Sequence, residues 1–197
     1  METYPPIIKA IIEQLKKLPG IGTKSAERIV EFFLKMDEND LVSFADNLKK
    51  LKQNVKLCKN CFSISQNDLC YVCSDAMREK KIAVVEEYKD VIAMEKAGFR
   101  GRYHVLGGRI NPLEKIGVDN LTIKDLLERL DREKPDEVII ATNPTPEGET
   151  TAQYLIEILK AHKYSVSRIA TGIPVGAEIE YTDSETLRIS LENRRKT

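Results

Sequence analysis

The sequence predicts an α + α/β protein, in which a helical N-terminal region and a small four-cysteine segment precede a domain with a mostly parallel sheet. Three observations predict this class. Apolar residues recur at helical spacing over residues 1–56, four cysteines follow close together, and short β-rich runs then alternate with helical stretches. Of the 197 residues, 42% are hydrophobic and 31% are charged, a composition typical of one compact domain or two small ones.

The overall charge gives no sign of a nucleic-acid partner, and the hydropathy pattern gives no sign of a membrane-spanning segment. Lys plus Arg and Asp plus Glu each number 31, so any anion-binding surface must come from local segregation of charge. No apolar run approaches the roughly 18 residues that span a bilayer. We therefore expect a soluble protein with no membrane partner. Clustered cysteines are typical of metal binding in a reducing compartment, which predicts a cytoplasmic location.

Three amphipathic helices are expected in the N-terminal region. The first runs from Pro5 to Leu18, and the second follows Thr23, which is expected to be its N-cap. The third runs from Asp40, and its apolar residues share one face: Leu41, Ala45, Leu48, Leu51 and Val55.

A turn with two glycines separates the first two helices and resembles a helix-hairpin-helix motif. Glycines at 20 and 22 let the backbone turn tightly and approach a phosphate, while the next helix offers the free N–H groups of its first turn. Lys24 and Arg28, four residues apart, share a helix face. We therefore assign contacts with DNA phosphates, without base readout, to Gly20, Gly22, Lys24 and Arg28. The alternative is an ordinary helix turn with a glycine cap.

Four cysteines form two Cys-x-x-Cys pairs separated by eight residues: Cys58 and Cys61, then Cys70 and Cys73. Two such pairs present four thiolates to one tetrahedral Zn²⁺, and a set of four sulfur ligands leaves no open position for chemistry. The spacing therefore predicts one structural zinc per chain. The alternative is a set of four buried or redox-active thiols.

The remaining chain alternates strands with helices, as crossover units of a parallel sheet do. The expected strands are Ile82–Val85, Tyr103–Leu106, Glu137–Ala141 and Val166–Ala170. The expected helices lie near Lys89–Lys96, Ile123–Arg132 and Thr151–His162. A last helix is expected to open at Thr182, with Glu185 completing a capping box.

Polar residues after two of these strands resemble a Toprim domain, the fold of topoisomerases, bacterial primases and some nucleases. In those enzymes a glutamate after the first strand and an Asp-x-Asp pair after a later one hold Mg²⁺. Glu86 fits the first position, whereas Asn143 and Thr145 occupy the two aspartate positions. The resemblance thus implies the fold without its full metal site. Glu147 and Glu149 follow at the expected start of a helix, where acidic side chains also suit the helix dipole.

Taken in order along the chain, these motifs resemble the RecR family of bacterial recombination mediators. The resemblance covers nearly the whole sequence and includes residues 172–183, sometimes described in that family as similar to a Walker B element. ATP hydrolysis is not expected, because the chain has no P-loop. The expected segments are a helical region at 1–56, a zinc finger at 57–77, a Toprim domain at 78–172 and a C-terminal segment with a helix at 173–197.

The resemblance implies a non-enzymatic mediator that binds single- and double-stranded DNA without sequence preference. It further implies a homo-oligomer, a ring-shaped tetramer or a dimer, that acts with RecO and in some contexts RecF. These partners would help to load RecA onto single strands coated by SSB. We expect Glu147 and Glu149 to contact a basic surface, which by resemblance belongs to RecO. The alternative function is a Mg²⁺-dependent Toprim nuclease or strand-joining enzyme, in which Glu86, Glu147 and Glu149 suffice for the metal.

Overall fold

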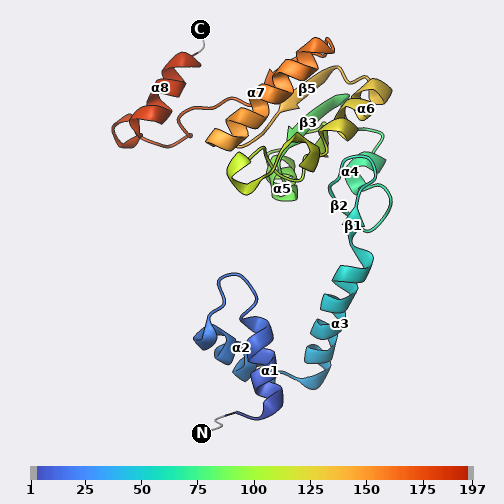
Figure 1. Ribbon diagram of the computed structural model, residues 1–197, viewed down its shortest axis with the longest axis vertical. Coiled ribbons are helices and arrows are strands. Elements are labelled where there is room, and N and C mark those ends of the chain that lie inside the picture. Colours follow the sequence, from blue (N-terminus) through green and yellow to red (C-terminus); the bar gives the residue numbers. More distant parts are fainter. Residues whose placement is uncertain (1–3, 195–197) are drawn as a thin grey trace. The chain divides into compact units, whose positions relative to one another are not determined.

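The computed structural model describes residues 4–194 as two compact units, with the boundary between residues 55 and 56. The ends of the predicted segments 1–56 and 173–197, which are residues 1–3 and 195–197, lie outside this range. Within residues 4–194, no helix combines the length and apolarity that crossing a membrane would require. Figure 1 gives the labels used below.

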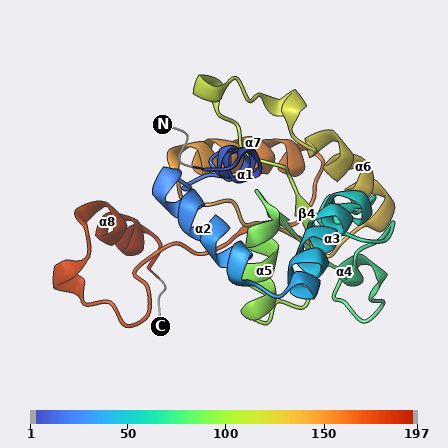
Figure 2. The same cartoon turned by 90° about the horizontal axis from the view of Figure 1, so that it is seen from below.

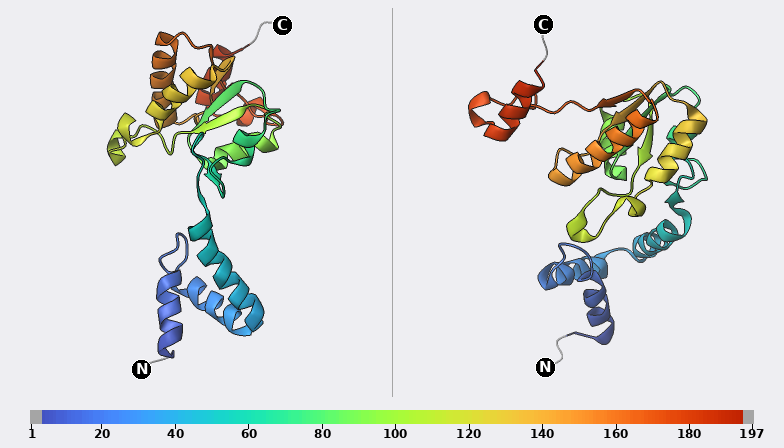
Figure 3. Two further views of the ribbon diagram at one scale, coloured as in Figure 1. Left: turned by 90° about the vertical axis from the view of Figure 1, so that its right-hand side faces the viewer. Right: turned by 45° about the horizontal axis from the view of Figure 1, so that its top comes forward.

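The first unit contains α1 (Pro6–Leu15), α2 (Thr23–Lys35) and α3 (Glu38–Asn54). Helices α1 and α2 pack on a small core of Ile12, Ala26 and Val30, and the loop between them is visible in Figure 3. The three predicted helices are present, with shifted ends. Thr23 was expected to be an N-cap but lies inside α2, because the extended backbone belongs to Gly22. Helix α3 begins after Asp37, whose carboxylate accepts a hydrogen bond from the Asn39 N–H.

The apolar face of α3 is exposed, although the periodicity of the sequence would place it in a core. None of its residues is buried, and Leu48 and Leu51 are both more than half exposed. The ring of Phe44 on α3 lies 5.8 Å from the ring of Phe33 on α2. Periodicity therefore identified the helix correctly, but the rest of this unit does not cover its apolar side.

The second unit begins with a small antiparallel pair, β1 (Lys56–Leu57) and β2 (Ile64–Ser65), followed by the short helix α4 (Tyr71–Ser74). A four-stranded parallel sheet follows, in the order β4-β3-β5-β6. Its strands are β3 (Lys81–Val85), β4 (Arg102–Val105), β5 (Glu137–Ile140) and β6 (Val166–Arg168). The predicted mixed fold with a mostly parallel sheet is confirmed.

Alternating side chains of β3 divide the second unit into layers. Ile82 and Val84 face a core made with α6 (Ile123–Glu133) and α7 (Pro146–Ala161). Ala83 and Val85 face the other way, toward α5 (Tyr88–Lys96) and the cysteine segment. Figure 1 shows α7 and α5 on opposite sides of the sheet. The cysteine segment thus shares a core with the sheet.

Helix boundaries near the C-terminus differ from the expectation. Helix α7 begins at Pro146, five residues before Thr151, because the Thr145 hydroxyl caps it and proline suits the first helical turn. The last helix, α8 (Ser184–Glu192), is capped by Asp183 instead of the predicted Thr182, and Glu185 pairs with Arg188. Figure 2 shows α8 beyond the extended segment that follows β6. The 3-10 turns η1 (Pro112–Glu114), η2 (Val118–Asn120) and η3 (Ile179–Tyr181) complete the unit.

Candidate functional site

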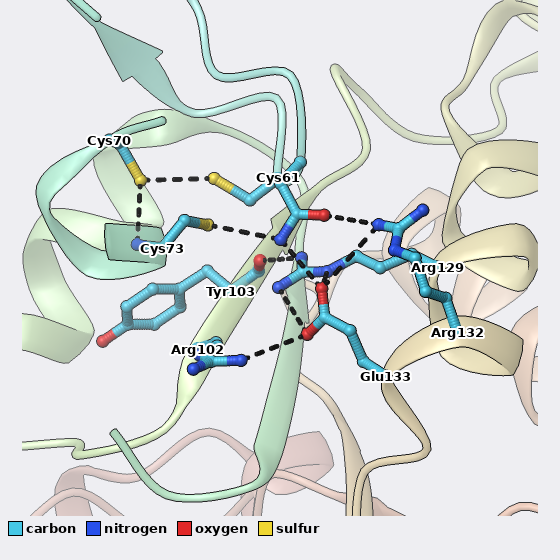
Figure 4. Close-up of polar contacts among 9 residues, drawn as sticks. Cys61, Cys70, Cys73, Arg102, Tyr103, Arg129, Arg132 and Glu133 are labelled. Atoms are coloured by element: carbon cyan, nitrogen blue, oxygen red, sulfur yellow. Dashed lines mark hydrogen bonds and ion pairs between the residues drawn. The ribbon is translucent and has the colours of Figure 1, made fainter. Parts of the chain in front are cut away.

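The four cysteines converge as their spacing predicted. The sulfur atoms of Cys58, Cys61, Cys70 and Cys73 all lie within 4.8 Å of one another, and three of these residues are buried. A tetrahedron of thiolates with Zn–S bonds of about 2.3 Å has sulfurs about 3.8 Å apart, so the set fits Zn²⁺. Figure 4 shows three of these side chains turned toward one another. The site is a closed, structural zinc site with four cysteine ligands.

Backbone N–H groups support the sulfur atoms. The N–H of Cys70 donates to the Cys58 sulfur at 3.3 Å, and the N–H of Cys73 donates to the Cys70 sulfur at 3.4 Å. The sulfurs of Cys61 and Cys70 lie 3.5 Å apart. The two backbone N–H donors favour thiolates, which are the form that binds zinc.

The zinc site is docked on the edge strand β4. The Val105 N–H donates to the carbonyl of Cys61 at 2.8 Å, so the first cysteine turn pairs with the outer edge of the sheet. Next to this bond the Phe62 ring meets the His104 ring edge-on, with centroids 5.4 Å apart. Burial, more than the charge of Arg129, lowers the pKa of His104 to about 4. The imidazole is therefore neutral near pH 7, and its Nε2 lies 3.0 Å from both the carbonyl oxygen and the hydroxyl oxygen of Thr122.

The helix-hairpin-helix turn contains two glycines with different backbone conformations, followed by two exposed cations. Gly20 has φ +78°, a conformation that L side chains rarely adopt, whereas Gly22 has ordinary extended backbone and caps α2. The first helical bond runs from the Ala26 N–H to the Gly22 carbonyl, so the amides of residues 23–25 precede it and face outward. Lys24 and Arg28 are exposed, and within residues 4–194 no carboxylate pairs with either. This end of α2 can receive an anion.

A buried carboxylate lies where β3 ends. Glu86 is 1% exposed, and its carboxylate accepts the Asn143 N–H at 2.8 Å and lies 3.4 Å from the Arg109 guanidinium. Gly148 packs against the same group, because a Cβ there would meet Glu86 Oε1 at 2.9 Å and the Asn143 carbonyl at 2.0 Å. Glu86 therefore ties two loops together at the carboxyl edge of the sheet.

Glu147 and Glu149 occupy the first turn of α7, as predicted, but do not join Glu86 in a metal site. The Glu149 carboxylate forms two hydrogen bonds with the Arg168 guanidinium, at 2.5 and 2.6 Å. Among residues 4–194, the four cysteines form the single cluster of three or more ligands suited to a metal ion. No sequence pattern pointed to Arg109 or Arg168, since their partners lie 23 and 19 residues away.

Comparison with known families assigns nearly the whole chain. Family models match as the RecR helix-hairpin-helix over residues 8–52, the RecR four-cysteine zinc finger domain over 55–75, the Toprim domain over 80–170 and the RecR C-terminal region over 172–195. A protein from Syntrophobacter fumaroxidans named "Recombination protein RecR" is 48% identical over 98% of this chain and 96% of its own. Proteins of the same name from Desulfatibacillum aliphaticivorans and a Nocardioides species are 43% and 45% identical, each over 98% of both chains.

Proposed function

This chain belongs to the RecR family of recombination proteins, and we therefore propose that it is a non-enzymatic, DNA-binding mediator of recombinational repair. It binds single- and double-stranded DNA without sequence preference in the cytoplasm. With RecO and RecF, it helps to load RecA onto single strands coated by SSB. The observation that carries the DNA-binding part is the start of α2, where outward-facing amides lie beside two exposed cations.

The proposed DNA contact uses groups that have no competing partner inside the described chain. Lys24 and Arg28 are four residues apart on α2 and are not paired with a carboxylate in residues 4–194, so their charge is available to phosphates. Gly20 and Gly22 carry no side chain that would keep a phosphate away, and a Cβ added at either would meet no atom within 4 Å. These features support a contact with the backbone of DNA, which is independent of its sequence.

The absence of catalysis is supported by what surrounds the Toprim carboxylates. Glu86 is held by Asn143 and Arg109, and Glu149 is held by Arg168, so each faces a donor that competes with a metal ion. The test is incubation of the protein with end-labelled single- and double-stranded DNA in Mg²⁺. We expect a mobility shift with strand length unchanged. Shortened or joined strands would instead establish the Toprim nuclease or strand-joining alternative.

The proposed homo-oligomer, a ring-shaped tetramer or a dimer, is supported by apolar side chains that the described chain leaves exposed. They lie on α2 and α3 and on the C-terminal segment: Phe32, Leu34, Val42, Leu48, Leu51, Val175, Ile179 and Tyr181. Apolar patches of this kind mark interfaces. Native mass measured with and without DNA tests this proposal, and Leu48→Lys with Leu51→Lys should lower that mass. The matched control is Ser43→Lys, which adds a charge to the same helix.

The partner site is proposed at the start of α7. Glu147 is half-buried and Glu149 is exposed, and both lie at the carboxyl edge of the sheet, where α/β folds bind ligands. We assign RecO to this acidic pair because a basic protein surface complements it, whereas DNA would be repelled. The ion pair with Arg168 orients Glu149 and reduces the charge that it offers.

A further inference from the structure

Asn60 lies between the first two zinc ligands and contacts three different groups. Its amide nitrogen donates to the Glu133 carboxylate at 2.8 Å and lies 3.8 Å from the sulfur of Cys73, while its carbonyl oxygen accepts from Arg132 at 2.6 Å. An asparagine amide has two N–H donors, so it can serve both acceptors together. The sulfur of Cys73 and the Glu133 carboxylate are both negative when zinc is bound, and the amide separates them.

Glu133 connects this contact to the sheet. Its carboxylate accepts a hydrogen bond at 2.8 Å from the guanidinium of Arg129, a side chain that is only 2% exposed, and lies 3.4 Å from Arg102. Arg129 in turn donates to the Tyr103 carbonyl on β4 at 2.5 Å. Figure 4 shows Glu133 next to Arg102, Arg129 and Arg132. A continuous chain of hydrogen bonds thus runs from a zinc ligand to the last turn of α6 and to the edge strand.

We propose that Asn60 and Glu133 are positioning residues of the zinc site, through which zinc binding and the packing of α6 on β4 are linked. The proposal rests on the four-cysteine zinc finger and is independent of the proposed DNA and RecO contacts. Groups that hydrogen-bond metal ligands orient them, and their loss usually weakens metal binding about tenfold or more. Because the coupling between two sites is reciprocal, zinc must then also stabilise α6 and β4.

Zinc release from the full chain tests the first half of the proposal. Zinc-loaded protein is mixed with a chromophoric chelator, and the rate of zinc transfer is measured for Asn60→Ala, Asn60→Asp and Glu133→Gln. We expect about tenfold faster transfer in Asn60→Ala. Asn60→Asp should be faster still, because it places a third negative group beside Cys73 and Glu133. The controls are Asn67→Ala, an exposed asparagine of the same finger, and Glu128→Gln, an exposed glutamate of α6, and both should match the wild type.

Hydrogen exchange tests the second half of the proposal, that zinc stabilises α6 and β4. Removal of zinc should reduce amide protection in peptides that cover β4 and the last turn of α6 as well as in the finger. In Asn60→Ala, the zinc-dependent part of the protection in α6 should shrink while protection within the finger still responds to zinc. A purely local role for Asn60 predicts instead that the zinc-dependent protection of α6 is the same in Asn60→Ala as in the wild type, because the Cys61 carbonyl also joins the finger to β4.

Two results would overturn the proposal. One is zinc transfer within about twofold of the wild type in both Asn60→Ala and Glu133→Gln. The other is protection of α6 and β4 that zinc removal leaves unchanged. If the Asn60 variants do not fold, Arg132→Ala decides the question, because Arg132 is exposed and its bond to Asn60 is lost without disturbing the core. In Arg132→Ala we expect zinc transfer to the chelator to be about threefold faster. An unchanged rate would refute the link between zinc binding and the packing of α6 on β4.

Discussion

The zinc finger and the helix-hairpin-helix turn are both short segments, but they use their polar groups in opposite ways. In the finger, N–H groups bind sulfurs, the Cys61 carbonyl accepts from β4, and the Asn60 amide is bonded on both sides. In the turn, the first amides of α2 face outward, and Lys24 and Arg28 are exposed. A motif whose polar groups are satisfied internally stabilises the fold, whereas one that leaves them free is suited to bind a ligand.

Loss of one zinc ligand should give the largest loss of stability, because it disrupts the zinc finger, whose polar groups are satisfied internally. Cys70→Ser should abolish stoichiometric zinc, and metal binding in such sites contributes on the order of 10 kcal/mol to folding. The shared core of Cys58, Cys61, Val72 and the sheet should loosen as well. Zinc content per chain and thermal melting measure both effects. Gln66→Ala, an exposed change in the same finger, is the control, and zinc loss with an unchanged melting curve would remove the structural role.

Removal of Arg129 should rank second, since it breaks a buried ion pair at the junction between finger and sheet. Arg129→Met keeps much of the packing volume but leaves Glu133 without its closest cation, at a cost of about 3 kcal/mol. Urea unfolding measures the loss. Arg132→Met, on the exposed side of the same helix, should cost far less. A second change, Glu133→Leu in the Arg129→Met background, should recover part of the stability, and a further loss would show that the charge is not the cause.

The elements of the fold could be predicted from the sequence because each depends on a local pattern. The spacing of the four cysteines identified the zinc site, and alternation in β3 fits a strand between two layers. Helix starts were less predictable, since Gly22 and Asp183 cap their helices through a backbone conformation that adjacent threonines could also adopt. Periodicity also showed that α3 has an apolar face, but it carries no information about what covers that face.

The partners of the site residues could not be predicted, because they come together only in the folded chain. Glu86 meets Arg109 from a loop 23 residues later, and Asn60 meets Glu133 from a helix 73 residues later. A resemblance to an enzyme family predicts the position of Glu86 but not the arginine beside it. That arginine, together with the Asn143 N–H, supports the proposal that Glu86 anchors two loops and does not hold a metal ion.

The helix-hairpin-helix turn should give a smaller effect on stability and a clear effect on DNA. Lys24→Ala with Arg28→Ala should leave melting almost unchanged, because both side chains are exposed. Binding should weaken equally for all sequences, and the slope of log K against log salt should fall by about 0.9 per lost contact on duplex DNA. Fluorescence anisotropy at several salt concentrations measures this. Lys124→Ala with Lys160→Ala removes the same charge elsewhere and is the control, and wild-type affinity in the Lys24 and Arg28 variant would refute the contact.

The acidic pair at the start of α7 should give the smallest change in the isolated protein. Glu147→Ala with Glu149→Ala removes two favourable interactions with the helix dipole, which contribute at most about 1 kcal/mol to stability. It also breaks the partly exposed ion pair of Glu149 with Arg168, which contributes little more, while zinc content and binding to bare DNA should persist. Association with RecO should weaken, and the loss should be larger at low salt, because exposed charges are screened at high salt.

A RecO pull-down at two salt concentrations, beside a melting curve, separates the partner role of the acidic pair from a role in the helix dipole. Arg168→Ala sharpens the test, because it frees the Glu149 carboxylate from its ion pair without removing it. If Glu149 contacts a basic partner, this variant should bind RecO at least as tightly as the wild type, whereas the double alanine variant binds it weakly. A role limited to the helix dipole predicts normal RecO binding in both variants, and that result would refute the proposed partner site.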